Sequence, residues 1–516
     1  MRNGKKILTM VASAALAVST FGGCGAGAGG AKEGVLTIRY FEGGYGREWI
    51  ENAAEEFKAY KKEKDGVEIG TSLTADPSIT TTAYQTLKSN NNVPDLMLTQ
   101  GGSWIEWVTA GYLESLKDVY DAKVKTSGGE VTVREFMKEE IADGAQLQRL
   151  YGQGEWQEWV MPWASLECAL AYNEDYLLTV NAGKNYEGRT SGGKWIAFPE
   201  TVEELKTYFN DVTAMGDGVA PIVWGGADGT NWFDYPILVW WAQQQGYESV
   251  NTKSGISESE GSFRSFFNYE SAEVWKQTGI QKAMDTVREV FVDTEGQKWK
   301  NTSANVKELT IQNAEAEFIK GNAAVMLAGS FLENEMKQFN SKNYTIKMAT
   351  FPLTENCETD ENGKGIKYHY VSEGDMMFVP AKATNKALAK EFLAFIASEE
   401  QVLKFTKYTG CMRPFKYDPL ALAPDHAWTA YQRSGFEIMK NCVALSTLPT
   451  LSRQERPAYL VYGGLNWRAS TNTDTITAKL LRLTGKEVMV TGDAGFRSIY
   501  ESGKVMLDDA KKTFED

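Results

Sequence analysis

Strand-like and helix-like segments alternate at the start of the chain, and this alternation restricts its fold more than any other feature. The strand-like segments are rich in β-branched and aromatic side chains, and the helix-like segments repeat apolar side chains every three or four residues. In order, they are a strand at 35–41, a helix at 47–64, a strand at 67–73, a helix around 78–89, a strand at 95–99 and a helix beginning near Trp104. This order and these lengths predict an α/β fold with mainly parallel sheets flanked by helices.

The loops that follow the predicted strands are the first candidates for a ligand site. In open parallel sheets, ligands bind beyond the carboxyl ends of the strands, which here are the loops 42–46 and 100–104. Gly44 and Gly46 also suggest a dinucleotide-binding fingerprint. Its third glycine would be Trp49, whose bulk prevents the close approach of strand and helix that this motif needs. We therefore interpret the glycines as a turn that opens a ligand-facing helix.

Length and charge exclude several classes of protein. The 516 residues leave room for about three domains or two large ones, and 42% hydrophobic residues supply sizeable cores. The net charge is −14, and it becomes −17 when the basic residues Arg2, Lys5 and Lys6 are removed with the first 23 residues. Such a chain is repelled by nucleic-acid phosphates and anionic lipid headgroups, so we expect no nucleic-acid partner.

Histidine and cysteine are too sparse for the common metal and nucleophile sites. The two histidines, His369 and His426, form no metal-binding pair, and the five cysteines include no Cys-x-x-Cys. Residues 360–363 resemble part of a calcium loop but lack its other ligands, so Asn362-Gly363 is better interpreted as a hairpin turn. We expect no cofactor and no metal. The remaining alternatives are a catalytic site that uses carboxylates and a protein without catalytic activity.

The N-terminus is typical of a secretory signal. Residues 1–6 are basic, residues 7–21 are apolar or small, and Gly22-Gly23-Cys24 follows. This ending resembles a bacterial lipobox, in which the cysteine is acylated, although Phe21 stands where leucine is usual. A plain signal with an incidental cysteine is the alternative. We expect residues 1–23 to be a lipoprotein signal peptide, Cys24 to carry lipid, and residues 24–33 to form a flexible tether on an exported protein.

No later run of 18 apolar residues occurs, so we expect this lipid to be the only membrane contact. The four remaining cysteines are far apart in the sequence and form no small disulfide framework, so free buried thiols are at least as consistent with them as disulfides. These cysteines are Cys168, Cys357, Cys411 and Cys442.

Two further segments predict local structure. Residues 198–205 are typical of a helix start, with Thr201 as the N-cap and acidic residues in the first turn. The apolar run 235–242 contains Trp240 and Trp241, of which we expect at least one in the core.

Several motifs follow one another along the chain. They are Val93-Pro94-Asp95-Leu96-Met97, Gly111-Tyr112-Leu113-Glu114-Ser115-Leu116, Met161-Pro162-Trp163 with Ala171-Tyr172-Asn173-Glu174-Asp175, Pro199 to Leu205, Phe318-Ile319-Lys320-Gly321-Asn322-Ala323-Ala324-Val325-Met326 to Gly329-Ser330-Phe331, and Lys390 to Ile396 with Glu399-Glu400-Gln401. In this order they resemble the motifs of one family, the solute-binding proteins of bacterial carbohydrate ABC importers of the maltose-binding-protein type. The chain departs from the pattern at Phe331, where tryptophan is usual, and it continues for about a hundred residues beyond Pro414.

The resemblance implies a two-lobed periplasmic-binding-protein-like fold, each lobe a mainly parallel sheet flanked by helices, with three hinge crossings near 165–169, 371–377 and 411–415. Lobe one would comprise 34–166 plus 375–411, and lobe two 167–374 plus 412–516. It also implies a monomer without cofactor that captures a carbohydrate between the lobes. Closure about the crossings would then present the sugar to the permease of an ABC importer.

A sugar site needs aromatic rings that face the pyranose C–H groups and charged or amide groups that bind its hydroxyls. The loops that the resemblance places in the cleft supply twelve candidates: Glu42, Tyr45, Gln100, Trp104, Trp163, Glu167, Trp232, Asp234, Phe331, Glu373, Asp375 and Arg413. We expect Trp104 and Trp163 to be stacking platforms, with core packing as the alternative for each. Glu167 lies between apolar residues, so we expect a ligand or an arginine as its partner.

Two other functions remain open at the level of sequence. An exported glycoside hydrolase would use two carboxylates about 5–9.5 Å apart, and the sequence does not exclude such a pair. The same fold could also bind a polyamine, a peptide or an anion. The fifteen tryptophans and the acidic composition favour a neutral sugar over an anion.

Overall fold

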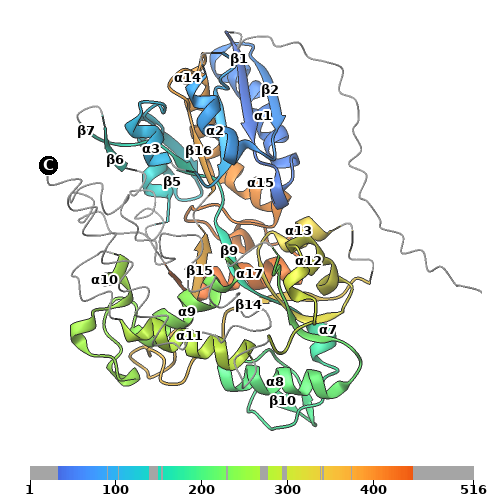
Figure 1. Ribbon diagram of the computed structural model, residues 1–516. Coiled ribbons are helices and arrows are strands. Elements are labelled where there is room, and N and C mark those ends of the chain that lie inside the picture. The colour runs from blue at the N-terminus through green and yellow to red at the C-terminus, as the bar shows by residue number, and fades with distance from the viewer. Residues whose placement is uncertain are drawn as a thin grey trace, which may run out of the picture.

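The computed structural model shows two α/β lobes, one above the other in Figure 1. It describes residues 33–89, 91–102, 104–138, 149–152, 155–227, 231–267, 277–292, 299–337, 339, 342–372 and 375–445. Cys24 and Glu373 lie outside the described residues, as do the signal peptide, most of the tether and the chain beyond residue 445.

The first lobe is built on a five-stranded sheet in the order β2-β1-β3-β16-β8. β1 pairs in parallel with both β2 and β3, whereas β16 runs antiparallel to its neighbours β3 and β8. The strands are β1 (Val35–Tyr40), β2 (Gly70–Ala75), β3 (Leu96–Gln100), β8 (Met161–Pro162) and β16 (Asp375–Phe378).

Helices and two hairpins surround this sheet. They are η1 (Gly43–Tyr45), α1 (Glu48–Asp65), α2 (Ile79–Lys88), α3 (Trp104–Thr109), α4 (Lys117–Asp121), α5 (Val133–Phe136), α14 (Lys386–Ile396) and α15 (Glu399–Thr409), with the hairpins β4 (Lys123–Thr126) to β5 (Gly129–Thr132) and β6 (Arg149–Gly152) to β7 (Glu155–Glu158). The three strand–helix units predicted at the start of the chain are confirmed, with shifts of at most three residues at their ends.

The second lobe is built on a six-stranded sheet in the order β12-β13-β9-β15-β17, with β14 also paired to β9. Only β9 runs against the other strands, so this sheet is also mainly parallel in strand direction. The strands are β9 (Leu166–Asn173), β12 (Ala220–Val223), β13 (Ala323–Gly329), β14 (Ile346–Ala349), β15 (Tyr368–Ser372) and β17 (Val443–Leu445).

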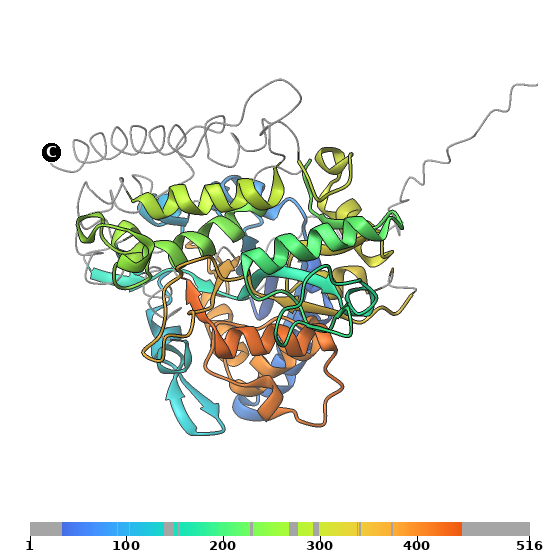
Figure 2. The ribbon, with the colours of Figure 1, turned by 90° about the horizontal axis from the view of Figure 1, so that it is seen from below.

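Helices cover both faces of the second sheet. In Figure 2, the green helices of this lobe lie on one side of the strands and the orange α17 lies on the other. The elements are α7 (Glu174–Leu177), β10 (Thr190–Ser191), β11 (Lys194–Trp195), α8 (Val202–Met215), η2 (Asn231–Phe233), α9 (Asp234–Gln245), η3 (Thr252–Ser254), η4 (Glu258–Glu260), α10 (Phe263–Phe267), α11 (Thr278–Phe291), η6 (Val306–Glu308), α12 (Ile311–Ile319), α13 (Leu332–Met336), α16 (Pro419–Leu422) and α17 (Ala430–Asn441).

Local sequence signals explain how several of these elements begin and end. Thr201 accepts a hydrogen bond from the backbone of Glu204, whose side chain bonds back to the cap, so the predicted start of α8 is confirmed. The predicted turn at Asn362-Gly363 is confirmed as well, since Gly363 has φ +77° and residues 359 and 365 pair antiparallel on either side. Trp240 and Trp241 are both fully buried in α9.

The chain passes between the two sheets where β8 leads to β9 and where β15 leads to β16. A third passage follows α15, because α15 packs on the first lobe whereas the later α17 packs on β14 of the second. Among the described residues, no helix is long and apolar enough to cross a bilayer. The four cysteines of these residues are free thiols, and three of them are buried.

Candidate functional site

A cavity of about 540 Å³ lies between the lobes, at the carboxyl ends of β1 and β3. Its first-lobe wall comes from the loop after β1, the loop after β3 and the first residue of β16. Its second-lobe wall comes from α12, α13 and residues near the starts of β9 and α9 and on β15. The lining residues are Phe41, Gly43, Gly44, Tyr45, Gln100, Gly101, Leu166, Trp232, Tyr235, Ile311, Gln312, Phe331, Glu335, Tyr370 and Asp375.

A buried hydrogen bond organises the first-lobe wall. The hydroxyl of Tyr45 donates to Oδ2 of Asp375 at 2.6 Å, and both side chains are at least 96% buried. Burial raises the pKa of Asp375 to about 7, although the bond from Tyr45 acts in the opposite direction. The register of β16 on β3 places Asp375 opposite Gln100. This wall therefore offers a carboxyl group and an amide to a ligand in the cavity.

Aromatic rings dominate the second-lobe wall. The ring of Trp232 meets Tyr235 edge-on at 5.8 Å between centroids, and Tyr235 lies 5.8 Å from Tyr370. Phe331 follows β13 and also faces the cavity. All four rings are only partly buried, so they leave apolar area available to a ligand.

Five of the twelve residues predicted from the sequence line this cavity together. They are Tyr45, Gln100, Trp232, Phe331 and Asp375. Glu373 lies outside the described residues.

The remaining six are placed elsewhere. Glu42 is held by Arg47 through two hydrogen bonds of 3.1 and 3.0 Å and does not line the cavity. Trp104 is half-buried against a small apolar cluster that includes Trp107 and Phe378. Asp234 is fully buried in the first turn of α9.

Trp163 is a core residue in this structure. Its side chain is fully buried, it stacks on Trp49 at 5.6 Å, and its ring nitrogen donates to the backbone oxygen of Thr99 at 3.2 Å. Tyr45 in turn packs edge-on against Trp163 at 4.6 Å. Trp163 therefore supports the cavity wall from behind, and no face of its ring is open to a ligand.

Two charged candidates make internal contacts. Glu167 is fully buried, and its Oε2 contacts Nδ1 of His369 on the neighbouring strand β15, so its partner is a histidine and not an arginine. Arg413 is 1% exposed and donates to the backbone oxygens of Trp163 and Ile396. Arg413 thus ties the third passage of the chain to the core of the first lobe.

Sequence reasoning missed Tyr235, Tyr370, Gln312 and Glu335. Glu335 could have been predicted as a cavity residue from its position in the sequence. It follows the candidate Phe331 by four residues, which places both on the same face of a helix. Tyr370 immediately precedes the predicted crossing at 371–377. No comparable signal marks Gln312.

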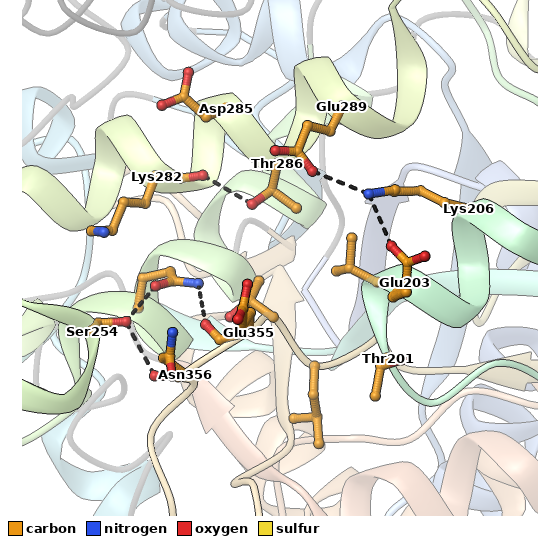
Figure 3. A pocket seen from close by; sticks show the side chains of 14 residues that line it. Thr201, Glu203, Lys206, Ser254, Lys282, Asp285, Thr286, Glu289, Glu355 and Asn356 are labelled. Carbon is orange, nitrogen blue, oxygen red and sulfur yellow. Dashed lines mark hydrogen bonds and ion pairs between the residues drawn. The ribbon is translucent and has the colours of Figure 1, made fainter. Parts of the chain in front are cut away.

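A second cavity, of about 650 Å³, lies on the second lobe alone, between α8, α11 and the loop 353–356 (Figure 3). Lys206 pairs with Glu203 at 3.1 Å and with Glu289 at 3.4 Å, so these charges satisfy one another. None of the twelve candidates lines it. Within the described part of the chain, no group of three or more His, Cys, Asp or Glu residues is arranged to hold a metal ion.

Residues 55–431 match the family model described as bacterial extracellular solute-binding protein. The chain belongs to this family. No curated protein matches this chain.

Solved structures share the fold of this solute-binding protein at low sequence identity. A probable secreted solute-binding lipoprotein from Streptomyces coelicolor has a TM-score of 0.57 at 14% identity, covering 92% of this chain and 99% of that one. RafE, in complex with raffinose, has a TM-score of 0.52 at 14% identity, covering 92% and 100%. The GacH receptor of Streptomyces glaucescens, solved unliganded and with acarbose, has a TM-score of 0.53 at 15% identity, covering 93% and 100%.

Proposed function

We propose that this solute-binding protein captures a carbohydrate, of two or more sugar units, in the cavity between its lobes and delivers it to the permease of an ABC importer without chemical change. The observation that carries the proposal is the lining of the cavity, in which the partly exposed rings of Trp232, Tyr235 and Tyr370 face Asp375 and Gln100. Rings bind the apolar faces of a pyranose, while carboxyl and amide groups bind its hydroxyls. The neighbours RafE and GacH, solved with raffinose and acarbose, support a ligand of this class.

In this proposal, lobe one comprises 34–166 plus 375–411, and lobe two comprises 167–374 plus 412–516. The two lobes move about crossings near 165–169, 371–377 and 411–415. Both walls of the cavity would contact the sugar, so the sugar stabilises the closed form over the open one. The closed form is then the one that the permease recognises, and the protein acts as a monomer.

A thermal-shift screen over neutral mono- and oligosaccharides tests the proposal. A ligand that binds only the folded state raises the melting temperature, and at a hundred times its dissociation constant it contributes about 2.7 kcal/mol. We expect at least one sugar to do so and to be recovered intact after overnight incubation. Shorter products would indicate a glycoside hydrolase, and a shift with polyamines, peptides or anions alone would indicate a non-sugar solute.

Trp232→Ala is expected to weaken binding of the sugar found in that screen by about ten- to a hundredfold, or about 1–3 kcal/mol, because a ring that faces a ligand resembles an aromatic anchor at an interface. Isothermal titration measures the affinity, and a melting curve measures the stability. Trp104→Ala is the matched control, since Trp104 is also half-buried but lies outside the cavity. Equal affinities of the two variants would contradict the placement of the site.

We also propose that Cys24 carries the lipid that anchors the protein at the cell surface or in the periplasm. Cys24→Ala is expected to release the protein from the membrane fraction, because the first 23 residues would then supply export but no acylation site. Fractionation and the intact mass of the N-terminal peptide check this. A wild-type protein without acyl mass, or a variant that stays in the membrane fraction, would contradict it.

A further inference from the structure

Two acidic side chains meet in the second-lobe wall of the cavity. Glu335 of α13 lines the cavity, and Glu315 of α12 lies directly against it. Glu315 is fully buried, and neither of its carboxyl oxygens accepts a hydrogen bond from a donor group in the described part of the chain. Its hydrogen-bonding neighbour is the carboxyl group of Glu335.

A carboxylate can only accept hydrogen bonds, so a bond between two carboxyl groups requires a proton on one of them. Burial, and after it the negative charge of Glu335, raises the pKa of Glu315 to about 9. Burial also raises the pKa of Glu335. Glu315 is therefore the member of the pair that keeps its proton at neutral pH, and Glu335 is the member that can carry a negative charge.

No cation offsets this charge among the described residues that line the cavity, since none of them is Lys, Arg or His. Asp375 adds a second carboxyl group from the other lobe. The phenol of Tyr431 on α17 interacts with Glu315 and stays neutral. Tyr431 also interacts with Glu333 of α13, whose pKa burial raises although Thr429 and Lys337 act in the opposite direction. The ionisable side chains among the described residues that line the cavity are therefore only carboxyl groups and phenols.

Glu335 also lies where the lobes touch. The side-chain amide of Asn334 donates to the backbone oxygen of Gly44 at 2.6 Å, across the two lobes. A Cβ atom at Gly44 would lie 3.2 Å from Oε2 of Glu335 and 3.0 Å from Cβ of Phe331. A ligand bound at this edge of the cavity would therefore lie next to Glu335.

We propose that Glu335, on the cavity wall where the two lobes touch, determines specificity in this cavity by admitting neutral or amino sugars and rejecting sugars that carry a carboxylate or a phosphate. The inference rests on the proposed function. A hydroxyl or an ammonium group donates to the free oxygens of the pair, whereas an anionic sugar would be buried against a like charge. Like charges placed together at an interface lower the affinity by about tenfold or more.

The test uses matched gluco- and galacto-configured oligosaccharides of two to four units. Each is prepared in the neutral form, with an amine at carbon 2, and with carbon 6 oxidised to a carboxylate. We expect wild type to bind the best neutral or amino form at least about tenfold more tightly than its carboxylate form. Glu335→Gln is expected to reduce this ratio by about tenfold or more, because it removes the charge at the cavity surface while keeping the shape.

Two further variants make the test specific. Glu315→Gln should preserve or increase the ratio, because the amide donates to Glu335 and leaves it a full carboxylate. Glu317→Gln is the matched control, since Glu317 lies on the same helix but pairs with Lys320 and Asn322 outside the cavity. Infrared spectroscopy at neutral pH should show a protonated-carboxyl band that is stronger in wild type and in Glu317→Gln than in Glu315→Gln, because Asp375 still contributes to the band in every variant.

The outcomes separate this inference from the proposed function. Equal binding of neutral and carboxylate forms by wild type overturns the inference alone, as does a ratio that Glu335→Gln leaves unchanged. A reduced ratio in Glu315→Gln overturns it too, and this variant decides the matter if Glu335→Gln does not fold. Failure of every form to bind wild type overturns both the inference and the proposed function.

Discussion

Trp163→Ala is expected to lower the free energy of unfolding by about 3–5 kcal/mol, the usual cost of deleting a large aromatic side chain from a core. The ring is fully buried between Trp49 and Tyr45, and its nitrogen donates to the backbone oxygen of Thr99. Alanine would leave a cavity and would remove this hydrogen bond, which adds to the lost hydrophobic burial. Chemical denaturation of the unliganded protein measures the change.

Trp163→Phe and Trp104→Ala are the controls for this result. Phenylalanine keeps most of the packing but loses the hydrogen bond, so its cost should be well below that of alanine. Trp104 is only half-buried, and its replacement should cost less than that of Trp163. Unchanged stability of Trp163→Ala, with lost sugar affinity, would instead make Trp163 a stacking platform.

His369→Ala is expected to destabilise the protein by a similar amount, about 3–5 kcal/mol, because it leaves a buried polar group without its partner. Glu167 and His369 are 0% and 3% exposed and contact one another between β9 and β15. Their outer atoms, Oε1 of Glu167 and Nε2 of His369, make no other hydrogen bond within the described part of the chain. After truncation of His369, the carboxyl group of Glu167 would be buried without its partner.

A double variant separates the loss of the pair from the loss of packing. Replacing both residues with leucine removes both polar groups, and such replacements of buried pairs are often neutral or stabilising. We therefore expect Glu167→Leu with His369→Leu to be more stable than His369→Ala. If His369→Ala lowers the free energy of unfolding by less than about 1 kcal/mol, Glu167 accepts hydrogen bonds from water or from another partner. The pair would then have no structural role.

Much of the fold could be predicted from the sequence, because the patterns that indicate it involve residues close together in the chain. Alternation of apolar side chains shows which segments form strands or helices, and the strand–helix units of the first lobe appear within a few residues of their predicted ends. The cap at Thr201 and the turn at Gly363 depend on neighbours only two to four residues away. The order of the family motifs then predicted the two-lobed architecture, which the structure and its neighbours share.

The candidate site was predictable only in part. Loop position identified Tyr45, Gln100, Trp232, Phe331 and Asp375, because the ends of strands and the passages between lobes must border the cavity. The position of a residue in a loop does not predict which neighbouring side chains cover it. Trp163 follows a proline and was expected to project, yet the ring of Trp49 covers it from α1.

The elements, the α/β class and the family could be predicted from the amino-acid sequence, since each follows from residues close together or from motifs in a set order. Which side chains meet depends instead on the tertiary structure. Glu167 and His369 are separated by 202 positions, and Tyr45 and Asp375 by 330. Burial and pairing of a polar group depend on the packing of such distant segments, and this packing decides whether an aromatic ring faces a ligand or the core and whether one of two adjacent carboxyl groups keeps its proton.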